Sequence, residues 1–165
     1  MRHLIASVSM LVLGVAAVAC GSASPADSFS VETRPESLEV DSGEALRVYV
    51  TVSNETADMV RIGRWSFEVE VSDMSGSKVW RSTAWTFPRP RAGSVLNKTE
   101  FAGGETAEVS TAWLLRDQDN RPVQPGPYKV TGVMILCPDP DNPEYSTCDI
   151  QEIADPTPAE ITVVQ

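Results

Sequence analysis

The sequence predicts an all-β protein, built as a single antiparallel β-sandwich of about seven or eight strands. Several short segments alternate apolar and polar residues with a period of two, clusters of turn-forming residues separate them, and no segment has a helical period. A chain of 165 residues with 42% hydrophobic residues suits one domain with an ordinary core. A closed β-barrel is the competing all-β architecture.

The predicted strands follow one another from residue 28 to residue 165. Short segments at 29–31 and 38–40 open the domain, and the clearest alternation follows at 46–53. Residues 65–72 and 78–81 flank a tight turn and therefore predict a hairpin. The remaining strands are predicted at 107–113, 128–137 and 159–165, separated by stretches rich in Gly, Pro, Asp and Asn.

The first nineteen residues predict a signal peptide. Arg2 precedes an uncharged run from Leu4 to Ala19, which is shorter than the roughly 20 residues of a membrane-spanning helix. Small residues then lead into Cys20, an arrangement that resembles the lipobox of bacterial lipoproteins. The resemblance implies cleavage before Cys20 and attachment of diacylglycerol to its thiol, with further acylation by chains such as palmitate. The alternative is an ordinary secretory signal cut at a site of small residues.

A lipid on Cys20 predicts that the protein is held on the cell membrane or the outer membrane, facing the extracytoplasmic side. Residues 20–27 are small and polar and predict a lipidated tether to the domain. Loss of Arg2 with the signal leaves 12 Lys+Arg against 23 Asp+Glu, a formal net charge of −11. Such acidity excludes unspecific nucleic-acid binding, so no nucleic acid is expected among the partners.

The two remaining cysteines, Cys137 and Cys148, predict a disulfide that closes a loop over residues 137–148. The enclosed segment is rich in turn formers, and closing so short a loop contributes on the order of 3 kcal/mol. A redox-active pair is the alternative, but that function favours C-x-x-C spacing at a helix start.

The content of ionisable residues excludes several kinds of chemistry. The chain has one histidine, His3, which lies in the predicted signal peptide. The mature protein is therefore expected to lack Ser-His-Asp or Cys-His machinery and imidazole zinc sites. We expect no enzyme activity, no cofactor and no metal, although carboxylate-pair chemistry needs no histidine and stays open.

The segment Phe87-Pro88-Arg89-Pro90-Arg91 is the candidate partner-binding loop. Its prolines limit the freedom of the loop and so lower the entropy lost on docking, while Arg89 and Arg91 stand out in an acidic protein. Phe87 would add an apolar contact. The alternative is a solvated edge loop in which proline guards against aggregation between strands.

The middle of the chain carries an ordered set of aromatic, glycine and charged positions. They are Val52-Ser53-Asn54, Phe67 to Asp73, Gly76, Val79-Trp80-Arg81-Ser82, Phe87, Gly104-Glu105, Trp113, and Pro125 to Val130. This pattern resembles the BsuPI family, the intracellular proteinase inhibitor domain of bacilli, over roughly residues 46–136. The resemblance implies an immunoglobulin-like β-sandwich and inhibition of serine proteinases. Among the matching residues, Trp80, Trp113 and Tyr128 are expected to be structural, with the Tyr128 hydroxyl bonded to backbone as in a tyrosine corner.

These observations predict a membrane-anchored extracytoplasmic lipoprotein whose β-sandwich binds protein. Serine proteinase inhibition is the first hypothesis, with a serine proteinase or another envelope protein as the partner. The alternatives are a non-inhibitory structural or assembly module of the cell envelope and a carbohydrate-binding module.

Overall fold

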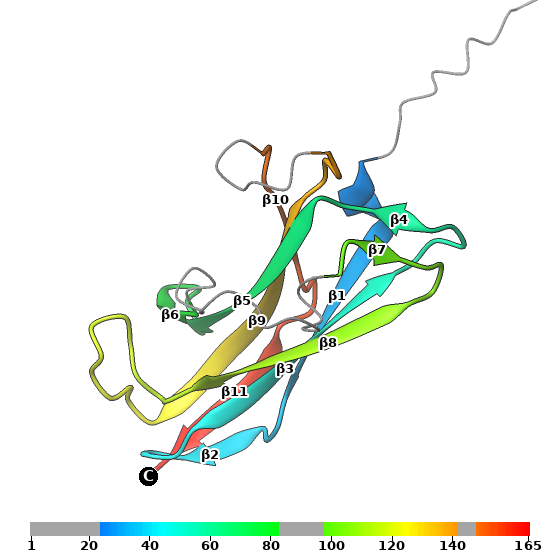
Figure 1. Ribbon diagram of the computed structural model, residues 1–165. Coiled ribbons are helices and arrows are strands. Elements are labelled where there is room, and N and C mark those ends of the chain that lie inside the picture. Colours follow the sequence, from blue (N-terminus) through cyan, green and yellow to red (C-terminus); the bar gives the residue numbers. More distant parts are fainter. Residues whose placement is uncertain (1–23, 83–97, 142–147) are drawn as a thin grey trace, which may run out of the picture.

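The computed structural model describes residues 24–82, 98–141 and 148–165. This part of the chain is nearly all β and contains eleven strands and one short 3-10 helix, η1 (Pro25–Ser28) (Figure 1). No helix among the described residues is long and apolar enough to cross a membrane. The all-β fold class predicted from the sequence is confirmed.

Two sheets make up the body of the domain. The first sheet has the strand order β1-β3-β8 and the second has the order β2-β11-β9-β5-β6, with β10 also paired to β9. All described pairings are antiparallel except that of β2 with β11, which is parallel. The strands of the first sheet are β1 (Phe29–Pro35), β3 (Leu46–Asn54) and β8 (Thr106–Trp113). Those of the second are β2 (Glu39–Asp41), β5 (Arg64–Asp73), β6 (Lys78–Arg81), β9 (Gly126–Cys137), β10 (Gln151–Ala154) and β11 (Ala159–Val164).

Eight of the strands correspond to the segments predicted from alternation. The other three are β4 (Val60–Arg61), β7 (Glu100–Phe101) and β10, of two, two and four residues. The strands β4 and β7 pair with each other as a small separate sheet. Strands this short are defined by their partners, so a local pattern does not reveal them.

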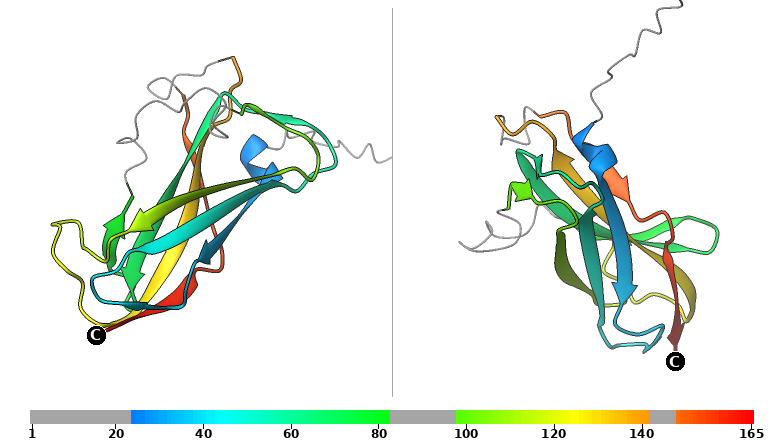
Figure 2. Two further views of the ribbon diagram at one scale, coloured as in Figure 1. Left: turned by 60° about the horizontal axis from the view of Figure 1, so that its bottom comes forward. Right: turned by 90° about the vertical axis from the view of Figure 1, so that its right-hand side faces the viewer.

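The two large sheets pack face to face as an immunoglobulin-like β-sandwich, which Figure 2 shows from two sides. The apolar positions predicted for β3 line this interface, and Val48, Val50 and Val52 are fully buried. Burying each such side chain stabilises the fold by roughly 1.5–3 kcal/mol. The largest buried side chains are those of Trp65, Trp113 and Phe101.

Gly132 in β9 lies at a close approach of the two sheets. A Cβ atom on Gly132 would lie 2.9 Å from both Thr33 Oγ1 and Val50 Cγ2, closer than real Cβ atoms come. The backbone N–H of Gly132 instead donates to Thr33 Oγ1 at 2.7 Å. A side chain at this position would push β1 and β3 away from β9.

The sandwich has two distinct ends. The helix η1 contacts β4 and β10 at one end, which we call the η1 end. The C-terminus and β2 lie at the opposite end, which we call the C-terminal end (Figure 1). The predicted disulfide between Cys137 and Cys148 is present and connects the start of the β9–β10 loop to its finish.

Candidate functional site

Several of the predicted functional residues lie outside the described part of the chain. These are Cys20, the expected lipidation site, and Phe87, Arg89 and Arg91 of the candidate partner-binding loop. The predictions for them stand as made. The described residues offer other surfaces on which a partner can bind, at the edges of the sheets.

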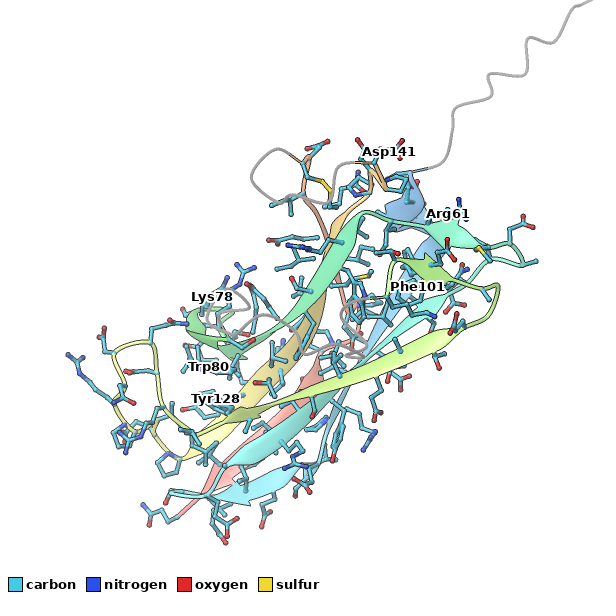
Figure 3. The ribbon with its side chains drawn as sticks, in the orientation of Figure 1. Arg61, Lys78, Trp80, Phe101, Tyr128 and Asp141 are labelled. Carbon is cyan, nitrogen blue, oxygen red and sulfur yellow. A yellow bond between two sulfur atoms is a disulfide. The ribbon has the colours of Figure 1, made fainter. Side chains whose placement is uncertain are left out.

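The aromatic residues singled out from the sequence form one structural cluster (Figure 3). The ring centroid of the buried Trp113 lies 6.3 Å from that of Trp80 and 5.7 Å from that of Tyr128. Trp113 Nε1 donates to the carbonyl of Arg116 at 2.8 Å. Their rings fill the interior between β6, β8 and β9, as expected for structural positions.

Tyr128 makes the backbone hydrogen bond expected of a tyrosine corner. Its hydroxyl donates to the carbonyl of Gln124 at 2.7 Å and so fastens the start of β9 to the preceding loop. Burial raises the pKa of Tyr128, and the negative charge of Asp73 raises it further. The pKa of Asp73 is itself lowered, because Ser75 and Ser77 donate hydrogen bonds to its carboxylate.

Unpaired sheet edges are the natural docking positions of a β-sandwich. An edge strand presents a row of backbone N–H and C=O groups that an extended chain can complete as an added strand. In the two large sheets the described residues form five such edges, at β1 and β8 in the first sheet and at β2, β6 and the four-residue β10 in the second.

The edge of β1 meets the second sheet at Thr33. The buried carboxylate of Asp155 accepts the N–H of Thr33 at 2.7 Å, and Asp155 N–H donates to the carbonyl of Gly132 at 2.9 Å. Pro35, at the end of β1, has no N–H to offer. This edge is therefore blocked part-way, at Thr33, and ends at a proline, whereas the outward N–H and C=O of Val31 have no partner among the described residues.

The edges of β6 and β2 in the second sheet are protected, and β10 has only four residues. The loop at 114–125 folds over β6, where Gln118 N–H donates to the carbonyl of Val79 at 3.1 Å. The side-chain amide of Gln118 approaches the carbonyl of Arg81 at 3.5 Å. Strand β2 has only three residues, and the hydroxyl of Ser37 donates a hydrogen bond to the carbonyl of Glu39. Short strands and covered carbonyl groups are common protections of sheet edges.

The edge of β8 is long and, within the described part of the chain, unpaired. Asn54 N–H donates to the carbonyl of Glu105 at 2.9 Å. This bond shows which of the opposite residue pairs of β3 and β8 are hydrogen-bonded to each other. Because bonding alternates along an antiparallel ladder, every second residue of β8 points its N–H and C=O away from β3. These residues are Thr106, Glu108, Ser110 and Ala112. Among the described residues, no group bonds to these outward backbone atoms.

The side chains along this edge suit an added strand. Thr106, Glu108, Ser110 and Ala112 are exposed, and three of them are small. Glu108 is the only charged residue within β8 and pairs with Arg34 across the outer face of the sheet at 3.2 Å. The edge therefore lacks the lysines, prolines and bulges that usually discourage pairing.

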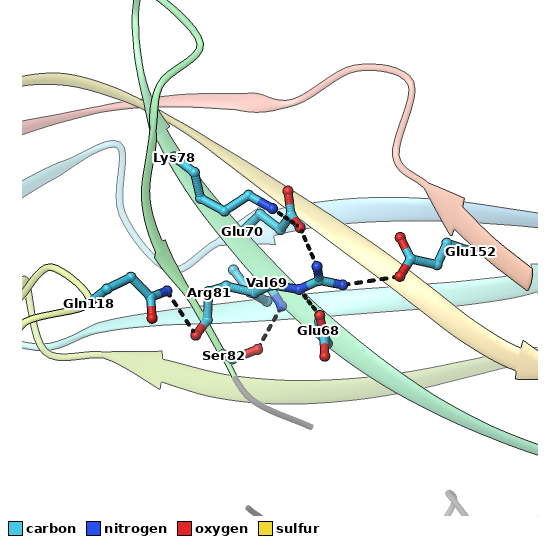
Figure 4. A network of polar contacts seen from close by, with 8 residues as sticks. All are labelled: Glu68, Val69, Glu70, Lys78, Arg81, Ser82, Gln118 and Glu152. Atoms are coloured by element: carbon cyan, nitrogen blue, oxygen red, sulfur yellow. Dashed lines mark hydrogen bonds and ion pairs between the residues drawn. The ribbon is translucent and has the colours of Figure 1, made fainter. Parts of the chain in front are cut away.

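A network of charges covers the outer face of the second sheet (Figure 4). The guanidinium of Arg81 contacts Glu68, Glu70 and Glu152, the last two at 3.2 Å. Lys78 pairs with Glu70 at 2.8 Å. Burial alone lowers the pKa of Arg81, but the hydrogen bond and charge of Glu68 outweigh it and leave the pKa raised.

This network explains how Glu68 is tolerated with a side chain only 4% exposed. The carboxylate has a cation against it, so its charge is compensated where it is shielded from water. The network also joins β10 to β5 and β6, since Glu152 belongs to β10. The carboxylates of Glu68, Glu70 and Glu152 all pair with Arg81 or Lys78, as is typical of a structural cluster.

A shallow groove of about 540 Å³ lies between the turn after β5 and the loop at 114–125. Asp73, Lys78, Gln118, Arg121 and Tyr128 are among its lining residues. The acids in its walls accept local backbone hydrogen bonds, as Asp117 does from Arg121 N–H at 2.8 Å. No group of three or more His, Cys, Asp or Glu residues that could hold a metal ion occurs in the described ranges.

Comparison with known proteins supports the fold. No protein-family model matches the chain, and no curated protein matches it. The C-terminal domain of wzt matches with a TM-score of 0.50 and 7% identity, covering 84% of this chain and 74% of that one. At this identity the likeness concerns architecture alone.

Two further solved structures match with lower TM-scores. The alkylpurine DNA glycosylase AlkC of Pseudomonas fluorescens, bound to DNA with an abasic site analogue, has a TM-score of 0.47 at 12% identity. That match covers 84% of this chain but 31% of the glycosylase. The CARDB domain of the PF1109 protein of Pyrococcus furiosus has a TM-score of 0.41 at 14% identity and covers 82% of this chain and 87% of that domain.

Proposed function

We propose that this protein is a lipid-anchored extracytoplasmic lipoprotein whose β-sandwich binds another protein. The partner adds an extended segment to the open edge of β8. One observation carries the proposal: β8 is eight residues long and its outward backbone groups have no partner among the described residues, whereas the other edges of the two sheets are short, covered or blocked part-way. Among the described residues, β8 is the longest edge without such contacts, which makes it a specific place for an added strand.

The energy available at this edge suits a partner held nearby. Thr106, Glu108, Ser110 and Ala112 together present up to eight backbone donors and acceptors. At about 0.5–1.5 kcal/mol net for each hydrogen bond, they supply roughly 4–12 kcal/mol before the entropy of ordering the partner is subtracted. Anchoring on a membrane raises the effective concentration of a partner on the same surface, which compensates for a weak contact.

Glu108 gives the edge its selectivity. In a sheet, side chains directly opposite one another interact, and like charges in that position are unfavourable. The partner segment is therefore expected to place Lys, Arg, Ser or Thr opposite Glu108. Envelope proteins with an extended basic or hydroxyl-rich segment fit this description.

The lipid anchor in this proposal rests on the sequence, through the apolar run and Cys20. The test is metabolic labelling with a radioactive fatty acid in a host that processes lipoproteins, followed by partition into detergent. We expect label and detergent partition for the native chain and neither for Cys20→Ser. Label retained by Cys20→Ser would contradict the anchor site.

The β8 edge is tested with a photo-crosslinking residue placed at Thr106 or Ala112 in the membrane-bound protein. Ser110→Pro removes one outward N–H and leaves the ladder to β3 intact, since that N–H points away from β3. Ser110→Ala is the matched control, because it removes the hydroxyl and keeps the N–H. We expect one defined adduct that persists in Ser110→Ala and is lost in Ser110→Pro. Adducts that are indifferent to Ser110→Pro would refute strand addition at this edge.

Serine proteinase inhibition is the particular activity that the resemblance to the BsuPI family implies. The lipidated protein in detergent, titrated against a panel of serine proteinases, tests it. Saturable inhibition that is lost in Arg89→Ala/Arg91→Ala would place the contact in the 87–91 loop. Saturable inhibition that is lost in Ser110→Pro would place it at β8.

A further inference from the structure

We infer that the η1 end of the sandwich faces the lipid surface and that the C-terminal end points away from it. This inference rests on the proposed lipid anchor at Cys20. It concerns the residues next to that anchor, which the structure ties to one end of the domain.

Ser24 is fixed to the η1 end by several contacts. Its hydroxyl donates to Gln151 Oε1 in β10 at 2.8 Å and accepts the N–H of Ala26 at 3.3 Å. Its backbone N–H donates to the carboxylate of Asp27 at 3.1 Å, and its carbonyl accepts the N–H of Asp27 at 2.9 Å. These contacts form a capping box on η1. Residues 24–27, predicted as part of the tether, are thus attached to the domain.

The remaining tether is short. Only residues 21–23 separate Cys20 from Ser24. Four backbone steps span at most about 14 Å when fully extended. The η1 end therefore cannot move further than this from the lipid on Cys20.

The opposite end is much further from the anchor. Strand β9 runs the length of the domain, from Gly126, which pairs with Val163 near the C-terminus, to Cys137 at the η1 end. Its twelve residues span about 37 Å at the rise of an antiparallel strand. The formal net charge of −11 expected for the mature chain opposes adsorption of the domain along its side on anionic lipid.

This orientation limits which proteins can pair with the β8 edge. Strand β8 begins beside Asn54, near the η1 end, and leads to the loop at 114–125 towards the C-terminal end. Two identical edges pair in a two-fold symmetric way when their strands run in opposite directions. Copies anchored in one membrane have their β8 strands pointing the same way. The edge is therefore available to a different protein, and two copies on the same membrane cannot occupy each other's edge as a two-fold symmetric pair.

The orientation is tested by energy transfer from a fluorophore on the protein to an acceptor lipid in vesicles of phosphatidylcholine and phosphatidylglycerol. The fluorophore is attached in the lipidated protein to Asp58→Cys, beside β4, or to Asp119→Cys, in the loop at 114–125. Both native side chains are exposed. We expect at least about threefold higher transfer from position 58, because it lies beside β4, which η1 contacts, whereas position 119 lies in the loop that leads into the start of β9 near the C-terminal end. Equal transfer from both positions would overturn the inference.

A lengthened tether tests whether the short tether is the cause of the orientation. Inserting about 20 Gly and Ser residues between Ala23 and Ser24 adds a flexible chain with a mean span of roughly 25 Å. The difference between the two positions is expected to shrink strongly, and its persistence would show that adsorption, not the tether, orients the domain. Flotation of the protein with vesicles reports the anchor separately. A protein that does not float would refute the lipid anchor and this inference with it, whereas flotation with equal transfer refutes the orientation alone.

Discussion

Replacing Asn54 with alanine is expected to destabilise the protein by about 3–5 kcal/mol, although the change removes only a few atoms. Asn54 lies at the end of β3 and is 1% exposed. Its Nδ2 donates to the carbonyls of Asp58, Phe101 and Ala102 at 2.8, 3.1 and 2.9 Å. Its Oδ1 accepts the N–H and hydroxyl of Thr56 at 3.0 and 2.8 Å.

The magnitude follows from what alanine leaves behind. Two amide hydrogens serve three carbonyls and one oxygen serves two donors, so about four hydrogen bonds of roughly 1 kcal/mol net are lost. Some of the abandoned backbone groups stay buried, and each such group costs about 1–3 kcal/mol if water cannot reach it. Asn54→Asp is expected to be at least as damaging, because a carboxylate oxygen would then face three carbonyl oxygens.

Urea unfolding followed by tryptophan fluorescence measures this effect. We expect a lower midpoint at unchanged slope for Asn54→Ala. Ser53→Ala is the matched control at the neighbouring half-buried position, and its midpoint should move little. A loss below about 1 kcal/mol in Asn54→Ala would refute the hydrogen-bond argument.

Three further predictions concern other interactions that stabilise the sandwich. Asp155→Ala should destabilise by about 2–4 kcal/mol, because it leaves the buried N–H of Thr33 unpaired, and amide hydrogen exchange at Thr33 should accelerate; unchanged exchange would contradict this. Tyr128→Phe should cost about 1 kcal/mol. Because burial raises the folded pKa of Tyr128 above its unfolded value, this residue's contribution is present below the unfolded pKa and falls as pH rises through the folded pKa. In an absorbance titration, the tyrosine ionisation that Tyr128→Phe removes should be the most alkaline one. Removal of an ionisation at the ordinary tyrosine pKa would contradict the raised pKa of Tyr128. Serine at both Cys137 and Cys148 should lower stability by on the order of 3 kcal/mol; a double variant as stable to urea as the native protein would show that the loop is held by other contacts.

Local patterns in the sequence predicted most of the fold. Alternation within β3, β5, β8 and β9 reflects one buried and one exposed face, which is a property of each strand by itself. The tyrosine corner was also predictable, because Tyr128 follows a turn-forming Pro-Gly-Pro segment. The disulfide followed from cysteine number and an export signal.

The candidate site could be predicted only in part. The loop with Phe87, Arg89 and Arg91 has a visible composition, but it lies outside the described residues. The alternation in β8 revealed a strand with small polar residues on one face. Nothing in that alternation distinguishes an edge strand from a central one, because neighbours in a sheet come from distant parts of the chain.

The residues that close the other edges carry no local signal either. Asp155 and Gln118 resemble ordinary loop residues in the sequence, and their importance arises from contacts across the domain with Thr33 and Val79. The same holds for β4, which among the described residues pairs only with β7, about forty residues later.

What the amino-acid sequence alone determines here is the all-β class, most of the strands, the disulfide and the expectation of an exported, lipid-anchored chain. Each of these depends on composition or on a pattern within a few residues. The tertiary structure decided which edge is open, which polar groups are buried, and which end of the domain lies beside the tether. Those properties depend on strands and loops that meet only after folding, so their physical cause is absent from any local stretch of the chain.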